Sequence, residues 1–112
     1  MTPEEFPSLA QFCTAYFHQD WDLEAPNALG VIHNYLQDES NSQVEQTIKE
    51  IEYMLALSVE TEQLSNFIEN KLKCYYNPRV YGISHSDWLL WVQISLKQGV
   101  STKNNALSAS LP

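Results

Sequence analysis

The sequence predicts an all-α protein, a compact single-domain bundle of about five helices. Three observations support this fold class. Apolar residues recur at steps of three and four along most of the chain, which is the helical period. No alternation of valine, isoleucine and threonine is long enough for a convincing strand. A chain of 112 residues also suits one domain with one hydrophobic core.

The first two predicted helices lie in the N-terminal third of the chain. The stretch FPSLAQFCTAYF places apolar residues on one side of a helix from Pro7 to His18, and proline is well tolerated in a first helical turn. After the acidic link QDWDLEAP, Asn27 can cap a second helix that ends near Asp38.

Two further helices are predicted in the middle of the chain. Ser42 and Glu45 form the S-x-x-E pattern of a capping box just before an apolar series that reaches Leu55. A fourth helix should begin at Thr61 and continue to Leu72, where the stretch CYYNP follows. The next stretch, NPRVYGIS, contains proline and glycine and is predicted to be a short irregular connection.

The last predicted helix contains the stretch DWLLWVQISLKQ. Its N-terminus can be capped by Ser84 together with Asp87, or by Ser86 alone. Gly99 follows the last apolar residue of this series and is typical of a C-terminal helix stop. This helix completes the predicted bundle.

The chain is therefore expected to consist of a helical domain, residues 1–98, and a disordered tail, residues 99–112, which has few apolar groups to bury. The longest apolar runs are far shorter than the roughly 20 residues that span a bilayer. The N-terminus carries two glutamates where a secretory signal would be positively charged. We expect a cytoplasmic protein without a membrane helix.

The two cysteines, Cys13 and Cys74, are 61 positions apart and lie inside apolar patterns. They are interpreted as buried thiols, in preference to a disulfide. Because burial raises the pKa of a thiol and hides it from substrate, Cys13 is a poor candidate for a catalytic nucleophile.

The available candidate ligands for a metal ion are His18, Asp20, Asp22, His33 and His85, of which the first four form the candidate set. No HExxH, EF-hand or paired E-x-x-H pattern accompanies them. The two aspartates could also form an acid and base pair, but the sequence contains no phosphate-binding glycine loop or cofactor fingerprint. We predict that the protein is not an enzyme and binds no cofactor. A small metal-binding or metal-dependent hydrolase domain is the alternative.

The charge distribution predicts a cationic partner. The formal net charge is −8, and no lysine or arginine occurs from Met1 to Ile48. Nucleic acid and anionic membrane surfaces would be repelled by this part of the molecule. A simpler interpretation is that the acidity only keeps the protein soluble. The carboxylates of this part are Glu4, Glu5, Asp20, Asp22, Glu24, Asp38, Glu39 and Glu45.

Several motifs resemble one protein family. The opening FPSLAQFCTAYFHQDWDLE is similar to that of the immunity proteins of bacterial contact-dependent growth inhibition systems, in which a Leu-x-x-Phe helix leads into Tyr-Phe-His-Gln-Asp-Trp. The stretches EIEYMLAL, ETEQLSNFI, CYYNP and SHSDWLLWVQISL match later landmarks of the family in order, so the resemblance spans about Phe6 to Lys97. It implies a small helical protein that binds and neutralises the C-terminal toxin domain of a cognate exoprotein.

The resemblance also implies that the toxin is a nuclease, for which a ribonuclease fits best. A nuclease is cationic where it holds phosphate, so carboxylates of a monomeric inhibitor in a 1:1 complex can compete with nucleic acid for that site. The alternative source of affinity is apolar contact from the stretch CYYNPRVY. The expected toxin-binding residues lie in two inter-helix segments and are Asp20, Asp22, Glu24, Asp38 and Glu39.

Overall fold

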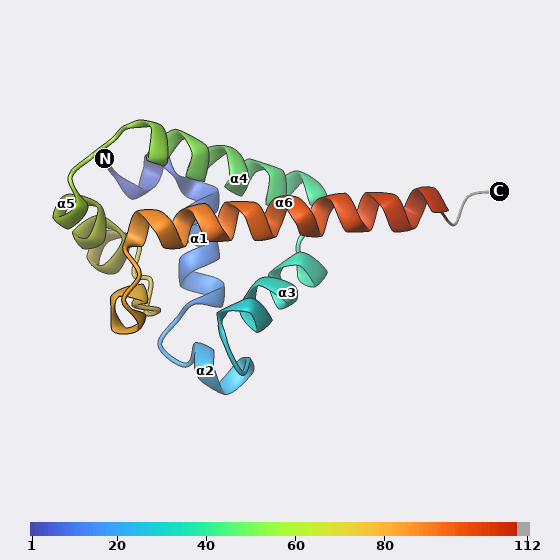
Figure 1. The fold of residues 1–112 in the computed structure, drawn as a ribbon, viewed down its shortest axis with the longest axis horizontal. Helices are drawn as coiled ribbons and strands as arrows, with labels where there is room; N and C mark the ends of the chain where they lie inside the picture. The colour runs from blue at the N-terminus through green and yellow to red at the C-terminus, as the bar shows by residue number, and fades with distance from the viewer. Residues whose placement is uncertain (110–112) are drawn as a thin grey trace.

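A computed structural model shows helices of different lengths packed around one apolar core (Figure 1). It describes the backbone of residues 1–109 and the side chains of residues 1–102. Every regular element within this part of the chain is helical, so the predicted all-α class is confirmed. In chain order the elements are η1 (Pro3–Glu5), α1 (Pro7–Tyr16), α2 (Trp21–Glu24), α3 (Ala28–Asp38), α4 (Asn41–Ala56), α5 (Thr61–Asn66), η2 (Phe67–Lys71), η3 (Pro78–Tyr81) and α6 (His85–Ala109).

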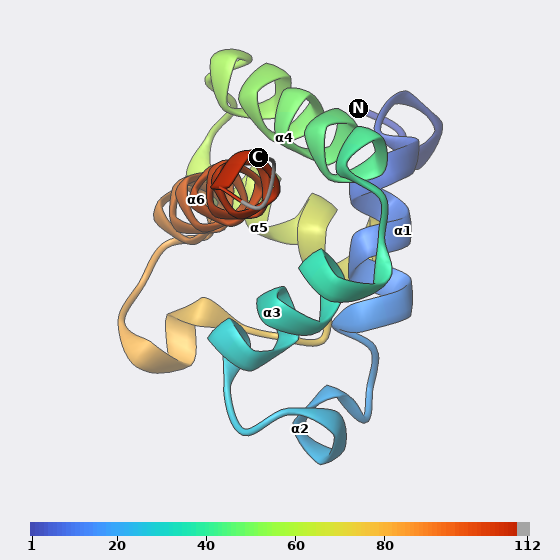
Figure 2. The same ribbon diagram turned by 90° about the vertical axis from the view of Figure 1, so that its right-hand side faces the viewer.

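The longest helix, α6, is the central element of the bundle. It packs against α4 on one side and α3 on another, and α5 contacts it as well. Figure 2 looks along α6, with α4 above it and α3 below it. The side chains that α6 buries are His85, Trp88, Leu89, Val92, Leu96 and Val100. Among the described residues, no helix is both long and apolar enough to cross a membrane.

Gly99 allows α3 and α6 to approach each other closely. A Cβ atom built at this position would lie 2.3 Å from Cδ1 and 2.9 Å from Cδ2 of Leu36 on α3. The prediction that Gly99 ends the last helix is therefore wrong, because α6 continues to Ala109. Residues 110–112 lie outside the described part, and the disorder expected of the 99–112 tail remains a prediction.

Side-chain caps from the preceding residue mark the starts of α3, α4 and α6. Asn27 Oδ1 accepts a hydrogen bond from the Gly30 N–H at 2.9 Å, as predicted for α3. The prediction for α4 is wrong by two residues, because Ser40 Oγ accepts from the Gln43 N–H at 3.1 Å and Ser42 lies inside the first turn. The backbone of Ser40 is extended, which is the conformation of an N-cap residue.

The last helix and the fourth helix begin where the sequence predicts. Ser84 Oγ accepts from the Asp87 N–H at 3.1 Å and caps α6. The fourth helix starts at Thr61, but its second half, η2, is a π-helix, in which the Leu72 N–H donates to the Phe67 carbonyl at 2.9 Å.

A side chain from α4 caps α1. Phe6 precedes α1 and offers no capping oxygen, so the first N–H groups of the helix need another acceptor. Glu50 Oε1 accepts from the N–H groups of Ser8 at 2.9 Å and Leu9 at 3.0 Å, and Gln46 donates to Glu50 Oε2 at 3.1 Å. Since Glu50 is buried, this cap joins α1 to α4 inside the protein.

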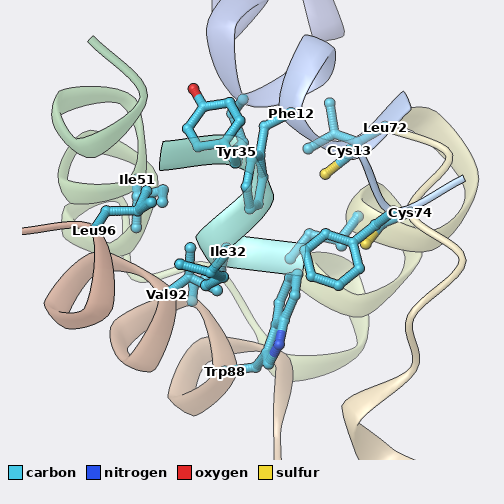
Figure 3. Packing of buried hydrophobic residues seen from close by; sticks show 14 of the residues in the cluster. Phe12, Cys13, Ile32, Tyr35, Ile51, Leu72, Cys74, Trp88, Val92 and Leu96 are labelled. Atoms are coloured by element: carbon cyan, nitrogen blue, oxygen red, sulfur yellow. The ribbon is translucent and has the colours of Figure 1, made fainter. Parts of the chain in front are cut away.

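The core is rich in aromatic rings (Figure 3). Phe12 and Tyr35 meet edge to face with centroids 4.6 Å apart, and the Tyr35 hydroxyl lies 2.7 Å from Thr47 Oγ1. Cys13 and Cys74 are free and buried, as predicted. A hydrogen bond with Cys74, together with burial, raises the pKa of the Cys13 thiol well above its usual value. This thiol is therefore unsuited to nucleophilic chemistry.

Candidate functional site

The net negative charge of the protein comes entirely from its N-terminal part. Residues 1–48 carry eight carboxylates and no lysine or arginine, whereas residues 49–112 carry six groups of each sign. The first part forms η1, α1, α2, α3 and the start of α4. The exposed carboxylates of these elements are therefore the candidates for a site that binds a cationic partner.

Two of the predicted carboxylates, Asp22 and Glu24, lie on the short helix α2, and Asp20 directly precedes it. The sequence suggested an acidic link here, but Trp21–Glu24 form one helical turn with Asp20 at its N-cap position. Trp21 holds this turn to the body, because its partly buried ring packs against Phe17 with centroids 6.1 Å apart. Asp20, Asp22 and Glu24 are all exposed, as a binding role requires.

His18 organises the chain that leads from α1 into α2. Its Nδ1 atom accepts a hydrogen bond from the Asp20 N–H at 3.1 Å, so its Nε2 atom carries the proton. That Nε2 atom lies 3.2 Å from Glu24 Oε2 at the other end of α2. The imidazole thus spans α2 and fixes the position of the Glu24 carboxylate.

Glu24, Asp38 and Glu39 line one surface pocket of about 320 Å³, although they come from two segments. The Tyr16 hydroxyl donates to Glu39 Oε2 at 2.6 Å in the same pocket. Burial and this hydrogen bond raise the pKa of Tyr16 above its usual value, so the phenol keeps its proton. The structure therefore brings the two predicted acidic segments together around a neutral hydrogen-bond donor.

The four candidate metal ligands do not converge. His18 is engaged with Asp20 and Glu24, whereas His33 lies on α3 in a different pocket, next to Leu29. Within the part of the chain that the structure describes, no group of three or more histidine, cysteine, aspartate or glutamate side chains is placed to hold a metal ion. The geometry therefore gives no support to a metal-dependent activity at His18, Asp20, Asp22 and His33.

Comparison with known proteins identifies the relatives of this fold. A model of the CdiI immunity protein family matches residues 5–96. The chain belongs to the CdiI immunity protein family. A search of curated proteins gave no match.

A solved structure shares the fold of this CdiI family member. It is the crystal structure of a CdiA-CT/CdiI complex from Y. kristensenii 33638, and one of its chains superimposes with a TM-score of 0.79 at 29% sequence identity. The alignment covers 82% of this chain and 98% of that chain. The family match from residue 5 to residue 96 includes all five predicted carboxylates.

The structure of this CdiI family member also reveals surface residues that the sequence analysis did not single out. Leu23 lies between the acidic residues of α2 and is 81% exposed, and Val80 and Tyr81 of η3 are exposed too. The stretch CYYNPRVY was considered as an apolar contact, but nothing in its pattern showed which side chains face outward. No local pattern marked Leu23 as exposed, since Trp21 also lies between two exposed carboxylates and is partly buried.

Proposed function

We propose that the protein is an immunity protein that binds and neutralises the C-terminal toxin domain of a cognate contact-dependent growth inhibition exoprotein. It acts in the cytoplasm as a monomer and forms a 1:1 complex with that domain. The observation that carries this proposal is the family match over residues 5–96, combined with the similarity to a chain of a CdiA-CT/CdiI complex.

We further propose that the toxin domain is a cationic nuclease, with a ribonuclease as the first candidate. A nuclease attracts phosphate with positive charge. The carboxylates of α2 and of the pocket at the end of α3 offer the opposite charge on an exposed surface. Asp20, Asp22, Glu24, Asp38 and Glu39 are accordingly the proposed contacts, and they would compete with nucleic acid by charge and by shape.

Co-purification tests this function directly. The C-terminal toxin domain of the cognate exoprotein would be expressed together with this protein, and the mass of the eluted complex measured by light scattering. We expect a 1:1 complex and the loss of RNA cleavage by the toxin domain when the protein is added in equal amount. Growth of cells that express the toxin domain should recover when this protein is expressed as well.

A matched control separates specific neutralisation from a general effect of acidity. An immunity protein of the same family from a different toxin pair should neither bind the domain nor restore growth. If this protein fails to bind the cognate toxin domain, the proposed function is wrong. If it binds a domain that cleaves no nucleic acid, immunity stands and the nuclease assignment is wrong.

A further inference from the structure

The segment between η2 and α6 exposes a group of large apolar side chains. Val80 and Tyr81 of η3 are 76% and 64% exposed, and Tyr75 and Ile83 on either side are exposed as well. We call Tyr75, Val80, Tyr81 and Ile83 the apolar loop. Large exposed apolar patches on a soluble protein mark interaction surfaces, because leaving such groups in water is unfavourable.

Hydrogen bonds hold the backbone of the apolar loop in one conformation. Asn77 Oδ1 accepts from the Arg79 N–H at 3.0 Å and caps η3. Gly82 has a φ of +75°, which glycine adopts easily, and the Ile83 N–H donates to the Pro78 carbonyl at 3.1 Å. A surface that is already ordered loses less conformational entropy when a partner binds.

Ion pairs fix η3 to the helix before it. The Arg79 guanidinium lies 3.0 and 3.2 Å from the two carboxylate oxygens of Glu69 on η2, and 3.4 Å from Glu62 on α5. Exposed ion pairs add little stability. Here they pair Arg79, the only cationic side chain of the segment 74–83, while Lys71 and Lys73 just before the apolar loop are exposed.

Tyr76 connects the apolar loop to α2. Its ring meets Trp21 edge to face at 5.4 Å and stacks on Tyr81 at 5.8 Å with an interplanar angle of 15°. Trp21 is the first residue of α2, which also carries the exposed carboxylates of Asp22 and Glu24. Both views place η3 and α2 on the side of the molecule away from α4 (Figures 1 and 2).

We propose that the apolar loop is the anchor that holds the toxin domain, with Val80 and Tyr81 seated in an apolar cleft whose rim is cationic. This inference rests on the proposed function. An exposed tyrosine beside charged groups has the composition of a binding hot spot with a polar rim. Charge complementarity mainly raises association rates, whereas buried apolar contacts mainly slow dissociation. The carboxylates of α2 and the apolar loop thus have separate kinetic roles.

Dissociation kinetics test this division. The probe is the purified C-terminal toxin domain of the cognate exoprotein, made catalytically inactive and immobilised on a sensor surface. The double variant Val80→Ala with Tyr81→Ala should dissociate about 30-fold faster, the effect typical of hot-spot truncation, with the association rate nearly unchanged. Tyr53→Ala is the matched control, because Tyr53 is 56% exposed on α4, on the other side of the molecule.

A second variant keeps the test independent of Tyr81, whose ring stacks on Tyr76. Val80→Lys places a positive charge against the proposed cationic rim and should also accelerate dissociation, with unchanged helical circular dichroism. A folded double variant or Val80→Lys protein that dissociates at the rate of the unaltered protein would overturn the inference alone. If the unaltered protein does not bind the domain, the proposed function fails and the inference fails with it.

Discussion

Two aromatic residues that pack near the same ring have opposite environments. Trp88 and Tyr81 both stack on Tyr76, with centroids 5.4 and 5.8 Å away, yet Trp88 is 2% exposed and Tyr81 is 64% exposed. A continuous series of rings therefore runs from the core to the surface at η3. Residue type does not distinguish the two ends of this series. Burial does, and it separates residues that hold the fold from residues available to a partner.

The same contrast in burial separates the carboxylates between α1 and α4 from those around α2. Between α1 and α4, the Glu50 carboxylate is buried and caps a helix. Around α2, Asp20 and Asp22 are exposed and belong to the part of the chain without positive charge. Substitutions on the core side should therefore change stability, and substitutions on the α2 and η3 side should change binding.

The largest expected effect is on the core side. Trp88→Ala should lower the free energy of unfolding by about 3–5 kcal/mol, because it removes a large buried ring and leaves a cavity. That is a large share of the stability of a small domain. Urea denaturation followed by circular dichroism measures the change. A loss below about 1 kcal/mol would mean that the ring series does not divide into core and surface as described.

The next largest expected loss of stability follows from removing the Glu50 carboxylate. Glu50→Ala should cost about 2–3 kcal/mol, because two buried N–H groups of α1 would lose a charged acceptor. Glu45→Ala is the matched control, since Glu45 is an exposed glutamate on the same helix, and it should change stability by less than about 0.5 kcal/mol. Equal urea midpoints for the two variants would contradict the capping role of Glu50.

The smallest effect concerns the pH dependence at His85, which is buried next to η2 with Nε2 3.5 Å from Glu69 Oε1. Burial lowers the pKa of His85, and Arg79 adds to this shift, although Glu69 and Glu62 oppose it. As the pH falls, the His85 side chain of the unfolded chain therefore takes up a proton near pH 6.5, whereas that of the folded chain does so only at lower pH. This contribution to stability is complete above pH 6.5 and decreases as the pH falls below it.

Comparison with His85→Gln isolates this contribution from that of the carboxylates. Urea midpoints of both proteins would be measured at pH 7.5, 6.5 and 5.5. The unaltered protein should lose more stability between pH 6.5 and 5.5 than His85→Gln does. Equal losses would show that His85 does not contribute to the acid sensitivity.

Local signals in the sequence were sufficient for the fold class and most helix starts. Asn27 and Ser84 were recognised as caps because each acts on an N–H three residues away. Gly99 was misinterpreted because the same residue suits a helix stop and a close helix contact, and the contact partner, Leu36, is distant in sequence. The cap supplied by Glu50 was missed for the same reason, since its partner N–H groups lie more than 40 positions away.

The candidate site was partly accessible from the sequence. Asp20 and Asp22 were predicted from charge alone, and their exposure agrees with a binding role without testing it. The meeting of Glu24 with Glu39 in one pocket required the packing of α2 beside α3, which no local pattern encodes. The stretch CYYNPRVY was predicted as a possible apolar contact, but its pattern does not show that Val80 and Tyr81 are exposed while Tyr76 is partly buried.

Association kinetics over a range of salt concentrations distinguish electrostatic attraction by the carboxylates around α2 from a role in solubility alone. Stopped-flow measurements would compare the unaltered protein with the double variant Asp20→Lys and Asp22→Lys, using the inactive toxin domain as partner. We expect fast association at low salt, on the order of 10⁸ M⁻¹s⁻¹, that slows steeply as salt is added. The variant should associate more slowly and with a weaker salt dependence, at unchanged helical content. An association rate insensitive to both salt and charge reversal would contradict the electrostatic role of α2.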